Sequence, residues 1–226
     1  MAGVKRRVFV TSAQEIDPLS WFTGPYLPLV FAGMITVVGS TVTLATWSIS
    51  ERPALQFVAL LLNALAGLLI FSRTRPLQPP MGWPIAALAL AASVAAMLIS
   101  ATDYAGTSFS LGLWWGPVAP ALTLVGLAPY LTVRRVLVLG IPMTVLSVVL
   151  GYLILYPVDP NLGPVGTAFV IAYPPAMAVA ASATFSYSVV STMLSMLESP
   201  SRIIVVGQAA RDAAATEFER VNLARL

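Results

Sequence analysis

The sequence of 226 residues contains no cysteine and no histidine. Without these side chains the chain cannot form disulfides or the usual zinc and haem sites. It also cannot use imidazole as a general base or build a Ser-His-Asp triad. A glycine-rich phosphate loop and a dinucleotide-binding turn are missing from the sequence too, and Lys5 is its only lysine. We therefore expect no catalytic residue, no cofactor and no metal ion in this chain.

Charged residues are also scarce, at 9% of the chain, while 58% of the residues are hydrophobic. Soluble domains contain about 25% charged and about 45–50% apolar residues. A globular fold of this size cannot bury so much apolar surface and still cover itself with polar groups. These proportions exclude a soluble enzyme, and the 12 basic residues are too few and scattered for a nucleic-acid-binding surface. We predict an all-α integral membrane protein whose partner is the lipid bilayer.

Six uncharged stretches are each long enough to cross a bilayer, which needs about 20 helical residues. The last stretch is too short for two crossings and a turn, so one long helix is expected there. The stretches are Pro18–Ser50, Pro53–Ser72, Pro76–Thr102, Tyr104–Val133, Val136–Val158 and Pro160–Leu197. The chain is accordingly predicted to form a cytoplasmic lead-in and interfacial anchor over residues 1–24, a six-helix bundle over 25–197, and a cytoplasmic helix over 198–226.

The basic residues favour one orientation of this bundle. All of them except Arg52 fall on the same side of the six-span arrangement. Because lysine and arginine in short loops mark the cytoplasmic side, both termini are expected in the cytoplasm. The opposite loops are too short to form a ligand-binding domain. Their acidic residues, Asp103 and Asp159, are expected to be solvated loop residues.

Polar residues within the predicted spans are few. No charged residue lies near the centre of a span, which argues against an ion-coupled transporter. Asn63 is interpreted as the one amide deep in the hydrocarbon, where it should bond to another helix. Small residues three or four apart in the first and sixth stretches predict close helix packing. The alternative is a polar path for a solute, lined by Thr36, Ser40, Thr43, Asn63 and Thr184.

The carboxyl segment differs in composition from the spans. Ser199 is a typical N-cap and Pro200 a typical first helical residue, so a signalling helix is expected to start there. The residues that follow are rich in Ala, Glu and Arg and have only a partial heptad pattern. Since they end without a helix stop signal, we expect the natural polypeptide to continue beyond Leu226.

The layout of six spans followed by the helix Ser201–Leu226 resembles the membrane input region of multi-pass bacterial sensor histidine kinases. The Ala-, Val- and Arg-rich composition is similar to that of actinobacterial proteins. The resemblance is one of layout across the whole chain and includes no diagnostic motif. It implies a homodimeric protein of a two-component system in the bacterial plasma membrane. Its phospho-acceptor and ATP-binding domains would lie outside this chain, and its cytoplasmic partners would include a response regulator.

Three functions are therefore weighed. The first is a membrane sensor and signal-transducing module that relays a signal through the sixth span to an output domain. The second is a small permease or transporter subunit, for which a water-accessible cavity is expected. The third is a membrane assembly or scaffold partner that uses its carboxyl helix to dock another protein.

Overall fold

The computed structural model describes residues 9–16, 26–74, 81–105, 107–108, 110–156, 158–159 and 161–223, with the side chains of 27–28 and of residues beyond 196 left out. These residues form helices and connecting turns and contain no strand, which confirms the all-α prediction for the described part of the chain. The elements are α2 (Ala13–Ile16), α3 (Tyr26–Ala45), α4 (Pro53–Arg73), α5 (Trp83–Tyr104), η1 (Leu111–Leu113), α6 (Val118–Leu127), η2 (Ala128–Tyr130), α7 (Val133–Leu155) and α8 (Pro164–Leu223).

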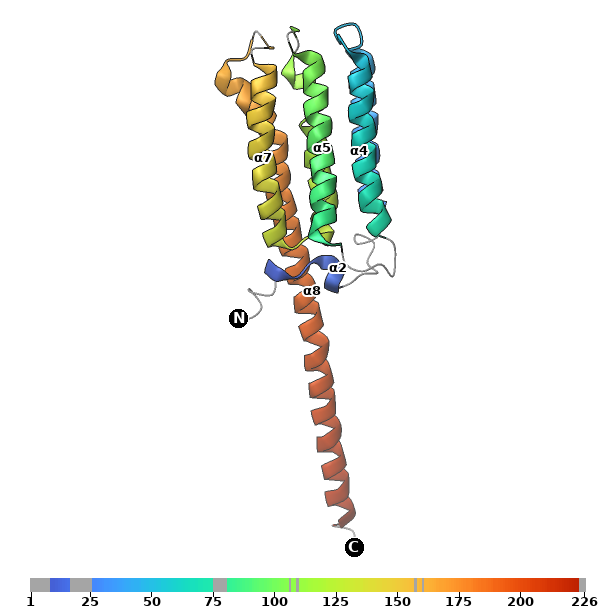
Figure 1. The fold of residues 1–226 in the computed structure, drawn as a ribbon. Helices are drawn as coiled ribbons and strands as arrows, with labels where there is room; N and C mark the ends of the chain where they lie inside the picture. The colour runs from blue at the N-terminus through green and yellow to red at the C-terminus, as the bar shows by residue number, and fades with distance from the viewer. Residues whose placement is uncertain are drawn as a thin grey trace.

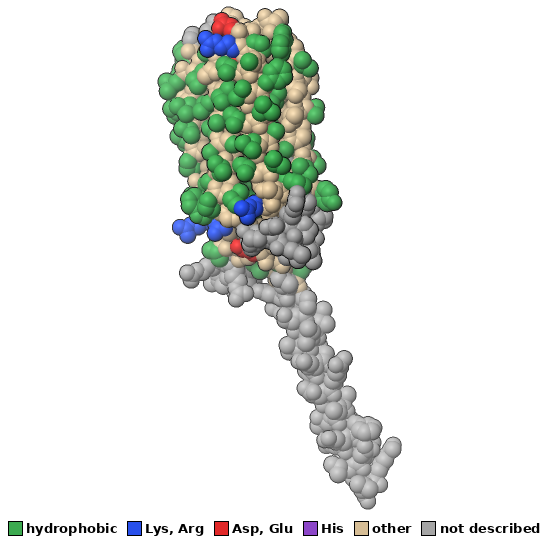
Figure 2. Space-filling view, turned by 45° about the vertical axis from the view of Figure 1, so that its right-hand side comes forward, with side chains coloured by type: hydrophobic (Ala, Val, Ile, Leu, Met, Phe, Trp, Pro, Cys, Tyr) green, Lys and Arg blue, Asp and Glu red, His purple; other side chains and the backbone are tan. Residues whose placement is uncertain are grey.

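The long helices form an elongated bundle in which α4, α5 and α7 run side by side and α8 packs along α7 (Figure 1). Hydrophobic side chains cover its flank, while charged side chains gather at its two ends (Figure 2). Within the described residues, 5 segments are long and apolar enough to cross a membrane. They are Pro53–Arg73, Trp83–Tyr104, Leu111–Tyr130, Val133–Leu155 and Pro164–Met196. Helix α3 adds the shorter apolar stretch Leu29–Ala45. The architecture is that of a multi-pass helical membrane protein.

The fourth predicted span is not one continuous helix. Between η1 and α6 the backbone is extended at Trp114 and turns at Gly116 and Pro117, and the segment ends in η2. Irregular backbone is tolerated at membrane depth only where protein surrounds it. This segment meets that condition, since 72% of an 18-residue stretch of Leu111–Tyr130 is buried, against 22–50% of the corresponding stretches in the other four candidate spans.

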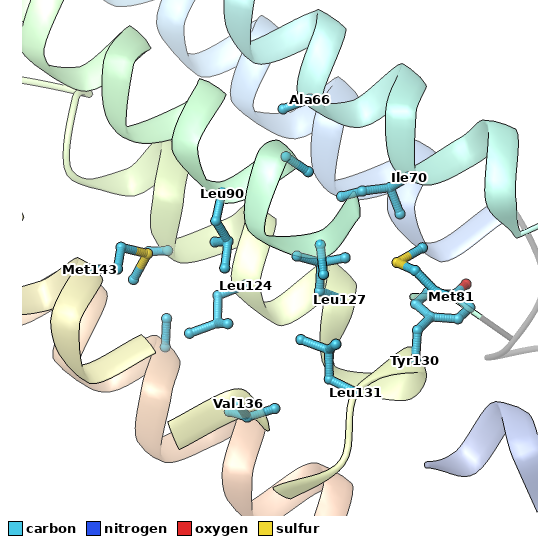
Figure 3. Packing of buried hydrophobic residues seen from close by; sticks show 14 of the residues in the cluster. Ala66, Ile70, Met81, Leu90, Leu124, Leu127, Tyr130, Leu131, Val136 and Met143 are labelled. Carbon is cyan, nitrogen blue, oxygen red and sulfur yellow. The ribbon is translucent and has the colours of Figure 1, made fainter. Parts of the chain in front are cut away.

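The largest hydrophobic cluster holds this central segment in place. Leu124, Leu127 and Tyr130 lie between residues of α4 and α5 on one side and of α7 and α8 on the other (Figure 3). Gly140 of α7 permits close packing on α8, because an added Cβ atom would lie 2.6 Å from Val179. The α6 segment is thus the axis around which the other helices pack.

Helix α8 is the longest element, with 60 residues. Its first half packs in the bundle, and its second half projects from one end as a single rod (Figure 1). The single long helix expected for the sixth stretch is confirmed. The expected helix start at Ser199 and Pro200 is wrong, because the helix that begins at Pro164 continues through both residues. One internal proline removes one backbone hydrogen bond, and here the helical turns on either side continue past it.

A short amino-terminal segment, Phe9–Ile16, lies against α8 where that helix leaves the bundle (Figure 1). Ala13 and Val190 are buried against each other there. The backbone N–H of Ser12 donates to Oε2 of Glu15 at 2.9 Å, and the Glu15 N–H donates back to Oγ of Ser12 at 3.4 Å. This reciprocal pair is a capping box. The segment therefore reaches α8 as a locally ordered unit.

Candidate functional site

Helices α4 and α5 carry polar residues at matching intervals on the faces that they bury. Gln56 and Asn63 are seven residues apart on α4, and Ser93 and Ser100 are seven apart on α5. Seven residues are two helical turns, so each pair lies on one face of its helix. Because the two helices run in opposite directions, Gln56 meets Ser100 and Asn63 meets Ser93. The bundle therefore contains two polar layers at different depths.

Gln56 is the centre of the layer nearer the end that carries Arg52. Its side chain is fully buried and uses both of its polar atoms. Oε1 accepts hydrogen bonds from Oγ of Ser100 at 3.0 Å and from Nε1 of Trp115 at 3.1 Å. Nε2 donates to the Ser100 carbonyl at 3.1 Å and to Oδ2 of Asp103 at 2.9 Å. Four hydrogen bonds satisfy the amide completely.

Asp103 extends this layer to the turn between α3 and α4. Its Oδ2 atom also accepts from Oγ of Ser50 at 2.5 Å, and its Oδ1 atom accepts from the backbone N–H of Arg52 at 2.6 Å. Three hydrogen-bond donors therefore contact the Asp103 carboxylate, and none of them is a cationic side chain. The residue is only 1% exposed. Beside it, Thr46 and Tyr104 share a hydrogen bond of 2.9 Å. We call Ser50, Gln56, Ser100, Asp103, Trp114 and Trp115 the outer polar cluster.

Two consecutive tryptophans supply the remaining contacts of the cluster. Trp114 Nε1 donates to Oγ of Ser100 at 3.1 Å, while Trp115 donates to Gln56. The indole of Trp115 packs against Gly39 of α3, where an added Cβ atom would lie 3.3 Å from the ring. Trp114 belongs instead to the hydrophobic cluster that contains Ile171 of α8. The polar cluster is therefore connected by direct packing to both α3 and α8.

Gly151 of α7 shows how closely these parts pack. A Cβ atom at this position would lie 3.1 Å from Ile171 and 3.8 Å from the Trp114 indole. The hydrogen bonds of the cluster and the packing of α7 on α8 therefore meet at one indole ring. The Trp114 indole therefore lies beside the contact between α7 and α8.

The deeper layer is smaller and incompletely satisfied. Ser93 Oγ donates to Oδ1 of Asn63 at 3.4 Å and shares a hydrogen bond of 2.6 Å with Oγ1 of Thr123. The amide nitrogen of Asn63 is buried and has no hydrogen-bond partner. An unpaired buried donor costs about 1–3 kcal/mol. The bond that the sequence predicts between Asn63 and another helix is present, and it joins α4 to α5.

The five residues proposed for a solute path differ in their exposure. Thr36 and Thr184 are exposed on the outside of the bundle, and Ser40 is half-buried. The Thr36 hydroxyl donates to the Ala32 carbonyl of its own helix at 2.8 Å. Thr43 and Asn63 are buried, and Thr43 Oγ1 has no hydrogen-bond partner. The other proposed residues, Ser199 and Pro200, are part of helix α8. The structure describes their backbone only.

The two acidic loop residues differ from the prediction. Asp103 and Asp159 are not solvated, being 1% and 6% exposed. Asp159 accepts hydrogen bonds from the backbone N–H groups of Leu111 at 3.1 Å and Asn161 at 2.9 Å. Each carboxylate accepts hydrogen bonds from backbone N–H groups of a neighbouring turn, which replace its contacts with water and are a physical reason for its burial.

Gln56 and the two tryptophans are the functional candidates that sequence reasoning missed. The seven-residue interval from Gln56 to Asn63 is visible in the sequence and places both amides on one face. The tryptophans look like interfacial anchors in the sequence, because each stands near the end of a predicted span. Comparison with known proteins adds no further residue, since no family model, curated protein or solved structure matches the chain.

The outer polar cluster is suited to holding helices in one arrangement. No three acidic side chains gather among the described residues, so they present no multidentate metal site. The cluster instead joins α4, α5 and the turn after α3 through neutral donors and one carboxylate. In a low-dielectric interior such bonds are strong when complete and costly when broken. A network of this kind favours discrete arrangements of its helices over a continuous range.

Proposed function

We propose that the chain is a membrane sensor module that transmits a change in helix packing through α8 to a cytoplasmic output domain. In this proposal α3 is the sixth crossing, since its 20 residues are about 30 Å long. The end of the bundle bearing Arg73, Arg134 and Arg135 faces the cytoplasm of a bacterial cell, and so do both termini. The resemblance in layout to the input regions of sensor histidine kinases supports the same assignment.

The observation that carries the proposal is the continuity of α8. Its apolar segment Pro164–Met196 has 33 residues, and the helix continues to Leu223 and projects beyond the bundle without an intervening loop. A permease has no need of such an extension, whereas a transducer requires a stiff connection between membrane and cytoplasm. Discrete rotation or sliding of a helix is a known form of switching. The α8 helix provides the mechanical link for it.

The contacts of Trp114 support an intramembrane input. The indole bonds to Ser100 in the outer polar cluster and packs in the cluster that contains Ile171 of α8. A rearrangement of α3, α4 and α5 that breaks the polar cluster therefore alters the surroundings of α8 directly. In this mechanism the signal is a change in the membrane or at its outer surface.

Cysteine crosslinking tests the proposed output. The chain has no cysteine, so single cysteines can be placed at every position from 201 to 223 without further changes. A homodimer that signals through paired helices should crosslink at positions three or four residues apart, which lie on one helix face. Leu61→Cys, on an exposed position of α4, serves as a control for random collisions. Crosslinking no stronger than at this control throughout 201–223 would contradict the proposal.

A further inference from the structure

A hollow of about 340 Å³ lies at the end of the bundle from which α8 projects, where α5 and α7 begin. It combines an apolar wall with two basic side chains. Its lining residues are Phe9, Val10, Trp83, Thr132, Arg134, Arg135, Val138 and Leu139. Trp83 is 57% exposed at the first turn of α5, where an amphipathic indole suits the boundary between lipid and water.

Arg134 and Arg135 give this hollow its charge. Both are exposed in the first turn of α7, and neither forms a salt bridge with any described residue. Guanidinium groups bind phosphate through paired, charge-assisted hydrogen bonds. Two adjacent arginines without a carboxylate partner thus present a site for a phosphate-bearing group at the membrane boundary.

A second, apolar hollow of about 300 Å³ continues from the first, since Leu139 lines both. One wall is α5, where Ala87, Ala91 and Ala95 follow one another at four-residue spacing and leave room beside the helix. The opposite wall includes Met143 of α7. The groove extends along α5 to Leu98, or roughly 16 Å by helical rise. One leaflet of a bilayer core is about 15 Å thick, so the groove matches the length of one leaflet.

We infer that the two hollows together bind one anionic glycerophospholipid. Its phosphodiester lies at Arg134 and Arg135, and one acyl chain lies in the groove between α5 and α7. The charge is confined to one end of an apolar groove one leaflet long, which is the distribution of polarity in a phospholipid. A protein helix about 10 Å across would need several times the volume of about 300 Å³ that the apolar hollow offers. A soluble phosphate would leave the apolar part empty. The inference does not depend on the proposed signalling function.

Native mass spectrometry of the full chain tests whether Arg134 and Arg135 bind the phosphate of the lipid head group. The protein is released from bilayers containing equal amounts of phosphatidylglycerol and phosphatidylcholine, and the retained lipid is counted. The wild type should retain phosphatidylglycerol preferentially. The double variant Arg134→Gln/Arg135→Gln should lower its retention roughly tenfold to thirtyfold, from about 1 kcal/mol for each basic residue. Arg73→Gln is the matched control, because Arg73 is exposed at the same end but does not line the hollow.

The groove is tested by filling it. Ala91→Leu/Ala95→Leu should reduce retention of phosphatidylglycerol while circular dichroism and the elution volume stay unchanged. Soluble glycerol phosphate should fail to displace the bound lipid. Equal retention of both lipids by the wild type, an equal loss in Arg73→Gln, or complete displacement by glycerol phosphate would overturn the inference. A crosslinked dimer formed through Ala91→Cys would also overturn it, because a second copy would then occupy the groove.

Discussion

Trp114 and Trp115 are neighbours in the chain, yet their indoles lie in different hydrophobic clusters and donate to two groups that are bonded to each other. Trp114 reaches Ser100, Trp115 reaches Gln56, and the Ser100 hydroxyl donates to the Gln56 amide. The extended backbone at Trp114 accounts for this divergence, since successive side chains of an extended chain point to opposite sides. One dipeptide thereby ties the polar cluster to the packing of α3 and of α8.

Replacing both tryptophans should have a non-additive effect on stability. Trp114→Phe and Trp115→Phe each remove one hydrogen bond, at a cost of about 1 kcal/mol. The loss of unfolding free energy in the double variant should differ from the sum of the two single losses by at least about 0.5 kcal/mol, because the two acceptors belong to one hydrogen-bond network. Unfolding in bicelles, followed by circular dichroism, measures this. Trp83 lies at the end of α5 far from Ser100, so Trp83→Phe is the control and should combine additively with Trp114→Phe. Strictly additive effects of Trp114→Phe and Trp115→Phe would refute the network.

Removing the buried carboxylate should destabilise the bundle strongly. Asp103→Ala leaves the donors of Ser50, Arg52 and Gln56 without their acceptor, and because the Gln56 amide is fully buried the loss should total about 3 kcal/mol. Glu51→Gln changes an exposed acidic residue in the adjacent turn and should stay within about 0.5 kcal/mol of the wild type. The same unfolding measurement compares the two. Similar stabilities for both variants would show that the Asp103 bonds contribute little.

The turn after the tryptophans should not accept a side chain at Gly116. A Cβ atom there would lie 2.3 Å from the Trp114 indole, so Gly116→Ala must displace that ring. The displacement should lower stability and change the near-ultraviolet circular dichroism of the protein. At Gly112 the nearest atom to an added Cβ is 3.8 Å away, so Gly112→Ala is the control. A normal near-ultraviolet spectrum in Gly116→Ala would contradict the observed position of Trp114.

Asn63 should be replaceable by an apolar residue of similar size. Its amide nitrogen is buried without a partner, and Ser93 retains its bond to Thr123 when the amide is removed. Asn63→Leu should therefore be neutral or stabilising, by up to about 1 kcal/mol. Asn63→Asp is the comparison, since a carboxylate at the same position should destabilise. A loss of about 2 kcal/mol or more in Asn63→Leu would mean that the amide has a stabilising role.

The continuity of α8 can be measured with spin labels. Labels at Met196→Cys and Asp212→Cys are 16 residues apart, or about 24 Å along an unbroken helix. Pulsed electron paramagnetic resonance should give one narrow distance distribution near this value. Pro200→Ala, made in the same background, should leave the distance unchanged. A shorter or much broader distribution in the first protein alone would place a break at Pro200.

The sequence predicts the helical class and most of the crossings because apolar stretches cut by charges are a direct physical signal. It fails where tertiary contacts decide the outcome. The stretch around Pro117 is long and apolar enough to cross a membrane as one helix, and its irregular backbone is possible because α3, α4, α5, α7 and α8 all pack against it. Likewise the propensities of Ser199 and Pro200 favour a helix start, whereas the observed helix passes through them.

The polar cluster was harder to predict than the fold. Asp103 stands at the end of an apolar stretch, where hydropathy alone suggests contact with water. Its burial depends on donors that are 51 and 53 residues away in the chain. The contact of Asn63 with another helix is predictable, because an amide in the middle of a span has few alternatives to a neighbouring helix. Gln56 lies only three residues inside its helix, near the end of a span, so its position alone does not predict that it is buried against another helix.

The segment Phe9–Ile16 has a mechanical consequence, because it touches α8 near Val190. Beyond that contact α8 continues for 33 residues to Leu223, or about 50 Å. In the proposed relay this contact is the pivot about which α8 tilts, since the part of α8 before it packs among the other helices. Tilting α8 by about 5° at this pivot moves its far end by about 4 Å over that length. The same tilt moves the other end of α8, about 39 Å from the pivot, by about 3 Å, so a tilt of this helix carries a displacement from the bundle to the far tip with little loss or gain in size.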